Sequence, residues 1–273
     1  MRMRSVFICK DSQKYLLYED HKPPAHKVTS IKSLGITSKS QLDKIFERFV
    51  KELDIMSKMH SPYVVKVHGA FTSSEELGLV MEYVERGSLY SVLEDPNERT
   101  KLTGTIKHSI LRDIAAAECY LYQHNVQHRD LKSLNVLITH DWHAKVADFG
   151  MSKTRDAISS SATNTSFHGG TLYWKAPELL RSGGVELGVF TEKSDVYSFG
   201  VIVWEVMCGE GNRPWQDYPT DEVMRRVMAG AQLSIPVGCP FGATKLMLEC
   251  WKEQEARPPF SKVSLMLQEN TWA

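Results

Sequence analysis

The stretch His128-Arg129-Asp130-Leu131-Lys132-Ser133-Leu134-Asn135 places a carboxylate, a cation and an amide close together. Transfer of a phosphoryl group needs these three chemical groups. A carboxylate meets the incoming hydroxyl, a cation offsets the charge of the moving group, and an oxygen atom helps to hold magnesium. Asp130, Lys132 and Asn135 are therefore the candidate catalytic residues, and Asn135 is also a candidate metal ligand.

A second carboxylate, Asp148, follows eighteen residues after Asp130, directly behind the apolar pair Val146-Ala147 and before Phe149-Gly150. This pattern predicts a metal-binding side chain at the end of a short strand. Each string alone also fits a solvated turn or an ordinary strand exit, but both occur here in one order and at one spacing. Together they resemble the catalytic and magnesium loops of protein kinases, and the resemblance implies that Asn135 and Asp148 hold Mg²⁺.

Two further segments resemble the same family. Ala176-Pro177-Glu178 matches the end of a kinase activation segment, and Asp-Val-Tyr-Ser-Phe-Gly at 195–200 matches the start of its central buried helix. The resemblance implies a buried ion pair between Glu178 and Arg257. Without the family match, Arg257 fits an exposed charge at a helix end equally well.

A chain of 273 residues with 42% hydrophobic side chains can bury a full core, and this length matches the single catalytic unit of two lobes that the resemblance implies. The 33 Lys and Arg balance the 33 Asp and Glu, so nothing steers the chain toward nucleic acid.

The five cysteines form no Cys-x-x-Cys pair and indicate reduced, cytoplasmic thiols. We expect no secretory signal and no membrane insertion, because the longest apolar run, 196–208, is too short and contains Ser198 and Glu205.

The expected fold is α+β, with a small antiparallel sheet and one main helix in an N-lobe (1–84) and a larger, mainly helical C-lobe (85–273). Apolar residues recur at helical spacing in 40–59 and again from Ile106 to Leu121. The expected N-lobe strands are 5–8, 15–18, 28–32, 64–71 and 77–84. A cleft between the lobes would bind the nucleotide.

The resemblance also assigns the ATP site. Thr29-Ser30-Ile31-Lys32 resembles the strand that carries the nucleotide-binding lysine, which makes Lys32 the candidate for the α- and β-phosphates and Glu52 its helix partner. Lys27 is the rival for this lysine. Met81-Glu82-Tyr83-Val84 resembles the hinge whose backbone pairs with adenine, with Met81 as the gatekeeper. The candidate ATP-binding residues are thus Lys32, Glu52, Met81, Glu82, Val84 and Asp148.

One departure from the family leaves an alternative open. The hairpin expected to cover the phosphates, Cys9 to Tyr15, contains no glycine, whereas kinases use a Gly-x-Gly-x-x-Gly loop there. The chain is then either an active kinase with a polar cover over ATP and Mg²⁺, or a pseudokinase scaffold that acts through protein–protein interaction. Catalysis is favoured because a scaffold has no chemical need for the catalytic set.

The acceptor is expected to be a Ser or Thr hydroxyl of a protein substrate, because Lys132, two residues after Asp130, resembles Ser/Thr-specific kinases. Thr171 would contact the same two residues. Cys250-Trp251 and Arg257-Pro258 resemble tyrosine kinases and their Ser/Thr relatives. The chain therefore resembles the tyrosine-kinase-like group of Ser/Thr kinases, which implies a role in intracellular signalling.

Overall fold

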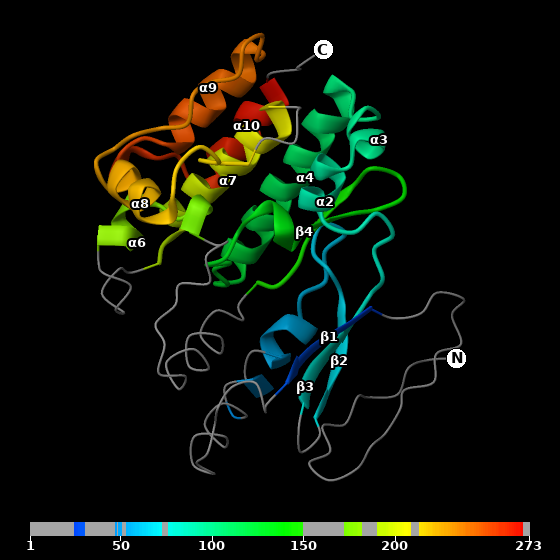
Figure 1. The fold of residues 1–273 in the computed structure, drawn as a ribbon. Coiled ribbons are helices and arrows are strands. Elements are labelled where there is room, and N and C mark those ends of the chain that lie inside the picture. Colours follow the sequence, from blue (N-terminus) through cyan, green and yellow to red (C-terminus); the bar gives the residue numbers. More distant parts are fainter. Residues whose placement is uncertain are drawn as a thin grey trace.

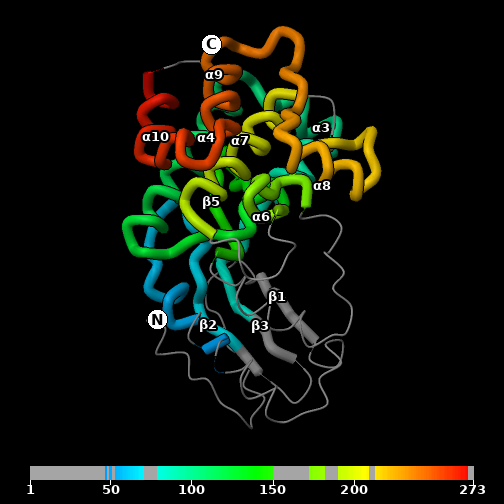
Figure 2. Tube along the Cα trace, turned by 90° about the vertical axis from the view of Figure 1, so that its left-hand side faces the viewer, coloured from blue at the N-terminus to red at the C-terminus, as the bar shows by residue number. Residues whose placement is uncertain are grey.

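The structure is a computed structural model, and it describes residues 25–30, 47, 49–50, 53–72, 76–149, 172–181, 190–208 and 213–269. Within these residues, a small antiparallel sheet occupies one end of the molecule and most of the helices occupy the other. Figures 1 and 2 show this division from two directions that differ by 90°. The predicted α+β fold with two lobes is confirmed.

The sheet of the N-lobe contains β1 (Ala25–Ser30), β2 (Val67–Thr72) and β3 (Glu76–Met81) in the order β1-β3-β2. Both pairings are antiparallel. The central strand β3 carries the buried side chains of Leu79, Val80 and Met81. Burial of these apolar residues favours the middle position, where both edges of the strand are paired.

The predicted strand ends were wrong at several places. The strand expected at 28–32 corresponds to β1, which begins three residues earlier, at Ala25, and Lys32 lies outside the described residues. The strand expected at 64–71 begins only at Val67, because Val64 and Val65 instead pair with Val146 of the C-lobe. The strand expected at 77–84 ends at Met81. The expected strands 5–8 and 15–18 lie outside the described residues.

The helix predicted over 40–59 is helical at the described positions 47, 49–50 and 53–57. Phe49, Leu53 and Met56 are buried, whereas Asp54 and Ile55 are exposed. This spacing of three and four residues is that of an amphipathic helix with one face against the core.

The C-lobe begins with the short helices that follow the Arg86-Gly87 turn. Its elements are α2 (Leu89–Glu94), α3 (Pro96–Arg99), α4 (Gly104–Gln123), η2 (Ser133–Asn135), β4 (Val136–Ile138), β5 (Ala144–Val146), η3 (Leu172–Trp174), α6 (Pro177–Arg181), α7 (Glu192–Cys208), α8 (Thr220–Met228), α9 (Phe241–Cys250), η4 (Gln254–Ala256) and α10 (Phe260–Glu269). Apart from the β4–β5 hairpin, these described elements are helical. The helical C-lobe is thus as predicted.

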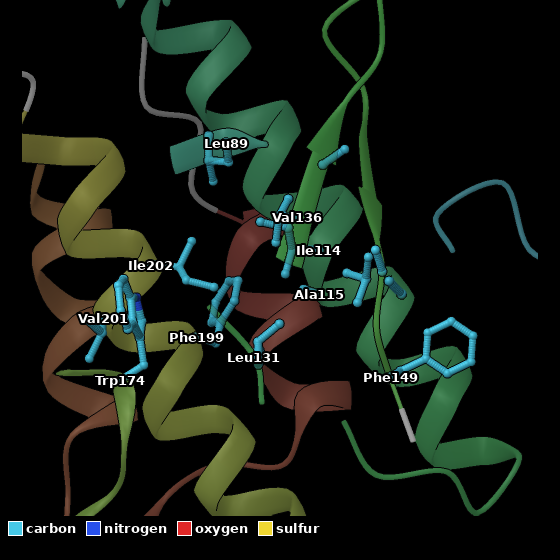
Figure 3. Packing of buried hydrophobic residues seen from close by; sticks show 14 of the residues in the cluster. Leu89, Ile114, Ala115, Leu131, Val136, Phe149, Trp174, Phe199, Val201 and Ile202 are labelled. Carbon is cyan, nitrogen blue, oxygen red and sulfur yellow. The ribbon is translucent and has the colours of Figure 1, made fainter. Parts of the chain in front are cut away.

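Helix α7 forms the centre of the C-lobe, since its residues from Ser194 to Val206 are buried. Figure 3 shows Phe199 and Ile202 of α7 pointing toward Leu131 of the catalytic loop. A Cβ atom at Gly200 would lie 2.7 Å from both Cβ of Cys250 and Nε1 of Trp251. Glycine is therefore needed here, because α7 approaches the end of α9 too closely for a larger side chain.

Helix α4 leads into residues 128–135, which are called the catalytic loop here after the kinase loop that they resemble. The Thr103 hydroxyl accepts a hydrogen bond from the backbone N–H of Ile106 at its N-terminus, over 3.3 Å. After its last residue the chain reaches Asn125, whose φ of 58° is left-handed and ends the helix. No helix in the part of the chain that the structure describes is long and apolar enough to cross a membrane.

Candidate active site

The β4–β5 hairpin brings the two predicted metal ligands to one end of the same small sheet. Asn135 directly precedes β4, and Asp148 follows β5 by two residues. The strands are antiparallel, with Val136 opposite Val146, so both residues lie at the same end. The backbone N–H of Ala147 donates to the carbonyl oxygen of Asn135 over 2.8 Å, which holds the two segments together.

Asp130, Lys132 and Asn135 form one hydrogen-bonded group. Lys132 Nζ lies 3.0 Å from Asp130 Oδ2. Asn135 Nδ2 donates to the carbonyl oxygen of Asp130 over 2.7 Å and to Asp130 Oδ2 over 3.1 Å. The side chains of Asp130 and Lys132 are only 10% and 13% exposed, so water screens their attraction weakly. All three predicted catalytic residues therefore lie together.

The backbone of this loop adopts left-handed conformations that non-glycine residues seldom occupy. Arg129 has a φ of 67°, and Asp148 has a φ of 61°. Such conformations cost about 1 to 3 kcal/mol each and persist only where the surroundings enforce them. The backbone strain therefore lies at Arg129, next to Asp130, and at the predicted metal ligand Asp148.

The buried carboxylate of Asp195 enforces the turn at Arg129. Its two oxygens accept the backbone N–H groups of His128, over 3.1 Å, and Arg129, over 3.0 Å, and the hydroxyl of Tyr122 donates to it over 2.6 Å. Burial raises the pKa of Asp195, and the hydrogen bonds that it accepts oppose this rise. Asp195 stands near the start of α7, so the central helix fixes the loop.

His128 is fully buried, and its uncharged ring supports the catalytic loop from behind. The backbone N–H of Asp130 donates to its Nδ1 over 3.3 Å, which places the proton of the neutral ring on Nε2. Burial lowers the pKa of His128. A ring that is neutral and buried supports the position of Asp130 without adding charge beside it.

The expected hinge residues lie where the sheet passes into the C-lobe. Met81 and Val84 are buried, and the backbone N–H of Glu82 donates to the carbonyl of Lys66 over 2.9 Å. The Glu82 carboxylate accepts the backbone N–H of Lys66 over 2.8 Å and two bonds from Lys145 Nζ, over 2.9 and 3.1 Å. This side chain thus joins the hinge to β5.

The remaining nucleotide residues lie outside the described part of the chain. These are Lys32, Glu52 and the hairpin from Cys9 to Tyr15. Thr171, expected beside Asp130, falls outside it as well. The described part of the predicted site therefore comprises the catalytic loop, Asp148 and the hinge.

The donor set fits a divalent cation bound to a nucleotide. Because Asn135 uses its Nδ2 group toward Asp130, the Oδ1 atom is the group left to act as an oxygen ligand. Asp148 is 9% exposed and supplies a carboxylate at the same end of the hairpin. Carboxylate and amide oxygens together with phosphate oxygens are the ligands that Mg²⁺ prefers.

The predicted ion pair between Glu178 and Arg257 is present. Arg257 Nη1 lies 2.6 Å from Glu178 Oε1, and Nη2 lies 3.0 Å from Oε2. Arg257 is 2% exposed, which rules out the alternative of a solvated charge at a helix end. The bidentate pair anchors α6 to the segment that precedes α10.

The sequence interpretation missed four residues of this site, Asp195, Ser133, Trp174 and Glu205. The sequence pattern identifies Asp195, which holds the loop, only as the start of a helix. Ser133 and Trp174 both donate to Glu205, over 2.7 and 2.8 Å, and none of these contacts was expected. The sequence did contain a signal for Glu205, which is a charged residue inside an apolar helical run. Such a residue requires partners when it is buried.

Comparisons with known proteins agree with these features. The sequence model described as protein tyrosine and serine/threonine kinase matches residues 15–267. The ephrin type-B receptor 3 of Danio rerio is 38% identical over 218 residues, which cover 79% of this chain and 42% of that protein. The ephrin type-B receptor 2 of Gallus gallus is 34% identical over 86% of this chain and 22% of that protein. The ephrin type-A receptor 4-A of Xenopus laevis is 33% identical over 87% of this chain and 23% of its own length. The chain thus spans less than half of each of these relatives.

Proposed function

Because this chain belongs to the family of protein tyrosine and serine/threonine kinases, we propose that it transfers the γ-phosphate of ATP to Ser or Thr hydroxyl groups of a protein substrate. The observation that carries the proposal is the hydrogen-bonded group of Asp130, Lys132 and Asn135. Family membership alone covers both tyrosine and Ser/Thr acceptors. Lys132, the cation beside the candidate base Asp130, supports the choice of a Ser or Thr acceptor.

In the proposed reaction, Asp130 orients the acceptor hydroxyl and accepts its proton as the new oxygen–phosphorus bond forms, while the bond from the γ-phosphorus to the bridging oxygen of ATP breaks and ADP leaves. Lys132, 3.0 Å from Asp130 Oδ2, offsets negative charge on the phosphoryl group as it moves. Asn135 fixes the Asp130 carboxylate through its Nδ2 group. The low exposure of these side chains strengthens each electrostatic contribution, because little water screens it.

ATP and Mg²⁺ are the proposed cofactors. Asp148 and Asn135 would hold the metal ion, which when bound neutralises charge on the phosphates. Backbone groups of the hinge at Met81, Glu82 and Val84 would face the adenine edge. Lys32 and its proposed partner Glu52 complete the set of nucleotide residues.

The proposed cellular role is signalling in the cytoplasm, as a member of the tyrosine-kinase-like group of Ser/Thr kinases. Lys132 supports the Ser/Thr side of this group, and the Cys250-Trp251 pair supports its likeness to tyrosine kinases. The structure shows no disulfide among the four cysteines that it describes, Cys119, Cys208, Cys239 and Cys250, which suits a reducing compartment.

Mass spectrometry of a generic basic protein incubated with the chain, ATP and Mg²⁺ tests the acceptor class. We expect phosphate on serine and threonine residues. Phosphate on tyrosine alone would overturn the Ser/Thr assignment while leaving the kinase assignment in place.

A scaffold without catalysis is the second candidate, and the glycine-free hairpin from Cys9 to Tyr15 favours it. A thermal-shift titration with ATP and Mg²⁺ separates the two, because a ligand stabilises the state that it binds. An active kinase shows a shift that the Lys32→Met variant reduces. Absence of a shift in both proteins would support the scaffold.

A further inference from the structure

Lys175 places a positive charge directly beside the candidate catalytic base. It follows Trp174, the last residue of η3, and lies two residues before the start of α6. Its Nζ donates a hydrogen bond over 3.3 Å to the carbonyl oxygen of Arg129, the residue that precedes Asp130. Because a carbonyl group has no net charge, this bond holds the ammonium group in place without cancelling its charge.

The backbone that carries Lys175 is fixed on its N-terminal side. The backbone N–H of Lys175 donates to the carbonyl oxygen of Leu172 over 3.0 Å. The Ser198 hydroxyl of α7 donates to the carbonyl oxygen of the buried Trp174 over 2.8 Å. Figure 3 shows Trp174 lying along α7 beside Val201. Lys175 itself is only partly buried, so a rigid segment holds a side chain that a substrate can reach.

The aromatic ring of Phe190 lies close to the charges of both Lys175 and Arg129. Lys175 Nζ lies 5.0 Å from the centroid of this ring, and the guanidinium carbon of Arg129 lies 5.6 Å from it. The electron-rich face of an aromatic ring attracts cations but leaves their charge in place. Arg129 Nε also donates to a neutral group, Oε1 of Gln127, over 3.1 Å. Two like charges are therefore held together beside the catalytic loop.

The carboxylate of Asp130 does not offset both of these charges, because Lys132 Nζ already lies 3.0 Å from its Oδ2 atom. Of the four charged side chains that the described contacts bring together here, Arg129, Lys132 and Lys175 are cations and Asp130 is the anion. The place where an acceptor meets Asp130 therefore carries an excess of positive charge in the part of the chain that the structure describes.

An acceptor hydroxyl that meets Asp130 brings its neighbouring residues close to Lys175. Consecutive Cα atoms of a peptide lie about 3.8 Å apart. Lys175 Nζ lies 3.3 Å from the carbonyl oxygen of the residue bonded to Asp130. Side chains within two residues of the acceptor hydroxyl are therefore those that can reach the ammonium group. A carboxylate there would accept a charge-assisted hydrogen bond, whereas a Lys or Arg would be repelled.

We propose that Lys175, supported by the charge of Arg129, selects protein acceptors that carry an Asp or Glu within two residues of the phosphorylated hydroxyl. Lys175 is thus a specificity-determining residue, which contacts a side chain of the acceptor and not the transferred phosphoryl group. This inference rests on the proposed phosphoryl transfer, and it names the chemical class of the acceptor, an acidic segment. It predicts an effect on the choice among acceptors and none on KM for ATP.

Matched acceptor peptides test the proposal through a ratio of rates. Each peptide contains one hydroxyl residue, of the type that the chain phosphorylates in a generic protein. The peptides differ only in having Glu, Gln or Lys at one of the flanking positions within two residues of that hydroxyl. At one or more of these positions, kcat/KM for the Glu peptide should exceed that for the Gln peptide about fivefold, the size expected for a partly exposed ion pair. High salt should reduce this ratio, because mobile ions screen such a pair.

Variants at Lys175 separate recognition of the acceptor from a structural role. Lys175→Arg keeps the charge and should keep the ratio, whereas Lys175→Gln should bring the ratio to about one. Lys175→Glu should reverse the preference, so that the Lys peptide becomes the better acceptor. A smaller folded fraction lowers kcat/KM for all peptides by the same factor and leaves the ratio unchanged.

Arg181→Gln is the matched control for these variants. Arg181 is an exposed cation on α6, and its guanidinium donates to the carbonyl oxygen of Met228 over 2.9 and 3.3 Å. Arg181→Gln should keep the wild-type ratio. A ratio near one in the wild type at all flanking positions, or a wild-type ratio that persists in Lys175→Gln, would overturn the proposal.

Binding of the same peptides with Ala in place of the acceptor residue gives a readout that needs no phosphoryl transfer. In fluorescence anisotropy, the Glu peptide should bind the wild type about fivefold more tightly than the Gln peptide, and Lys175→Gln should remove this difference. If the wild type transfers no phosphate, the proposed function fails, while a preference for the Glu peptide that depends on Lys175 still supports recognition of an acidic segment. Equal binding of the two peptides to the wild type would overturn that recognition as well.

Discussion

Arg257 and Glu178, seventy-nine residues apart, form a bidentate ion pair with distances of 2.6 and 3.0 Å. The guanidinium also donates to the carbonyl oxygens of Lys252 and Lys193. Removal of one partner leaves the other charge buried alone. We expect Arg257→Ala to lower the free energy of unfolding by about 3 to 5 kcal/mol, measured by urea denaturation.

A solvent-exposed arginine provides the matched control. Arg225 pairs with Glu222 over 2.7 Å, but its side chain is 67% exposed. Arg225→Ala should therefore change stability by less than about 1 kcal/mol. Equal losses in the two variants would show that the buried pair has no special role in anchoring α6.

Glu118 in α4 is fully buried, and neither of its carboxyl oxygens has a hydrogen-bond partner among the described residues. Burial, followed by the nearby Asp195 carboxylate, raises the pKa of Glu118 well above its ordinary value. Glu118→Met should raise the free energy of unfolding by about 1 to 3 kcal/mol, because the cost of an unpaired polar group disappears.

Asp113 on the same helix is the control for this substitution. It is buried too, but it accepts hydrogen bonds from the backbone N–H of Ala144 over 3.0 Å and from His143 over 2.9 Å. Asp113→Leu should destabilise the chain because Ala144 loses its acceptor. Destabilisation by Glu118→Met of a similar size would mean that Glu118 has a partner that stabilises it.

The stability of the chain should depend on pH through Glu205. Burial raises the pKa of Glu205 from 4.5 to about 8 in the folded state. Between these values the folded state keeps a proton that the unfolded state releases, so the free energy of unfolding falls as pH rises, by up to about 1.4 kcal/mol per unit. Below 4.5 and above about 8 this contribution is constant.

Urea denaturation from pH 5 to pH 9 on the wild type and on Glu205→Gln measures the effect. The difference between the two proteins isolates Glu205 from the other titrating groups. The difference in unfolding free energy should change with pH up to about 8 and then level off. A difference that is independent of pH would contradict the raised pKa.

The Glu82–Lys145 contact should influence nucleotide binding, because it ties the hinge to the β4–β5 hairpin. Both side chains are partly exposed, at 27% and 19%, so the contribution is modest. We expect Lys145→Met to raise KM for ATP about two- to fivefold and to leave KM for the protein acceptor unchanged. Lys66→Met is the control, since the described hydrogen bonds between Lys66 and Glu82 use the backbone N–H and carbonyl groups of Lys66 and not its side chain. Equal KM values for ATP in the two variants would argue against this role.

Elements with a strong local pattern were predictable from the sequence. The spacing of Ile106, Ile110 and Ile114 predicted a helix, and α4 covers that stretch. The apolar run after Asp195 predicted a buried helix, and α7 is buried along most of its length. Strand ends were less predictable, because pairing between lobes decides them. Val64 is β-branched, as residues in strands often are, yet it pairs with Val146 of the hairpin rather than extending β2.

The candidate site likewise contains contacts that the sequence predicts and contacts that it does not predict. Asp130, Lys132 and Asn135 are close in sequence, and short-range geometry brings them together. The contacts of Glu205 join residues that are 72 and 31 positions away, and only the packing of α7 brings them into reach. A buried acid in an apolar helix signals that partners exist, but the sequence does not show which residues they are.

Transfer of labelled γ-phosphate from ATP to a protein acceptor, compared between the wild type and Asp130→Asn, is the most direct test of the proposed kinase. Asp141→Asn is the matched control, because the Asp141 side chain is 84% exposed. We predict that Asp130→Asn lowers the rate by about 10²- to 10⁴-fold and that Asp141→Asn leaves it unchanged. Equal rates in the wild type and Asp130→Asn would contradict the assignment of Asp130 as the catalytic base.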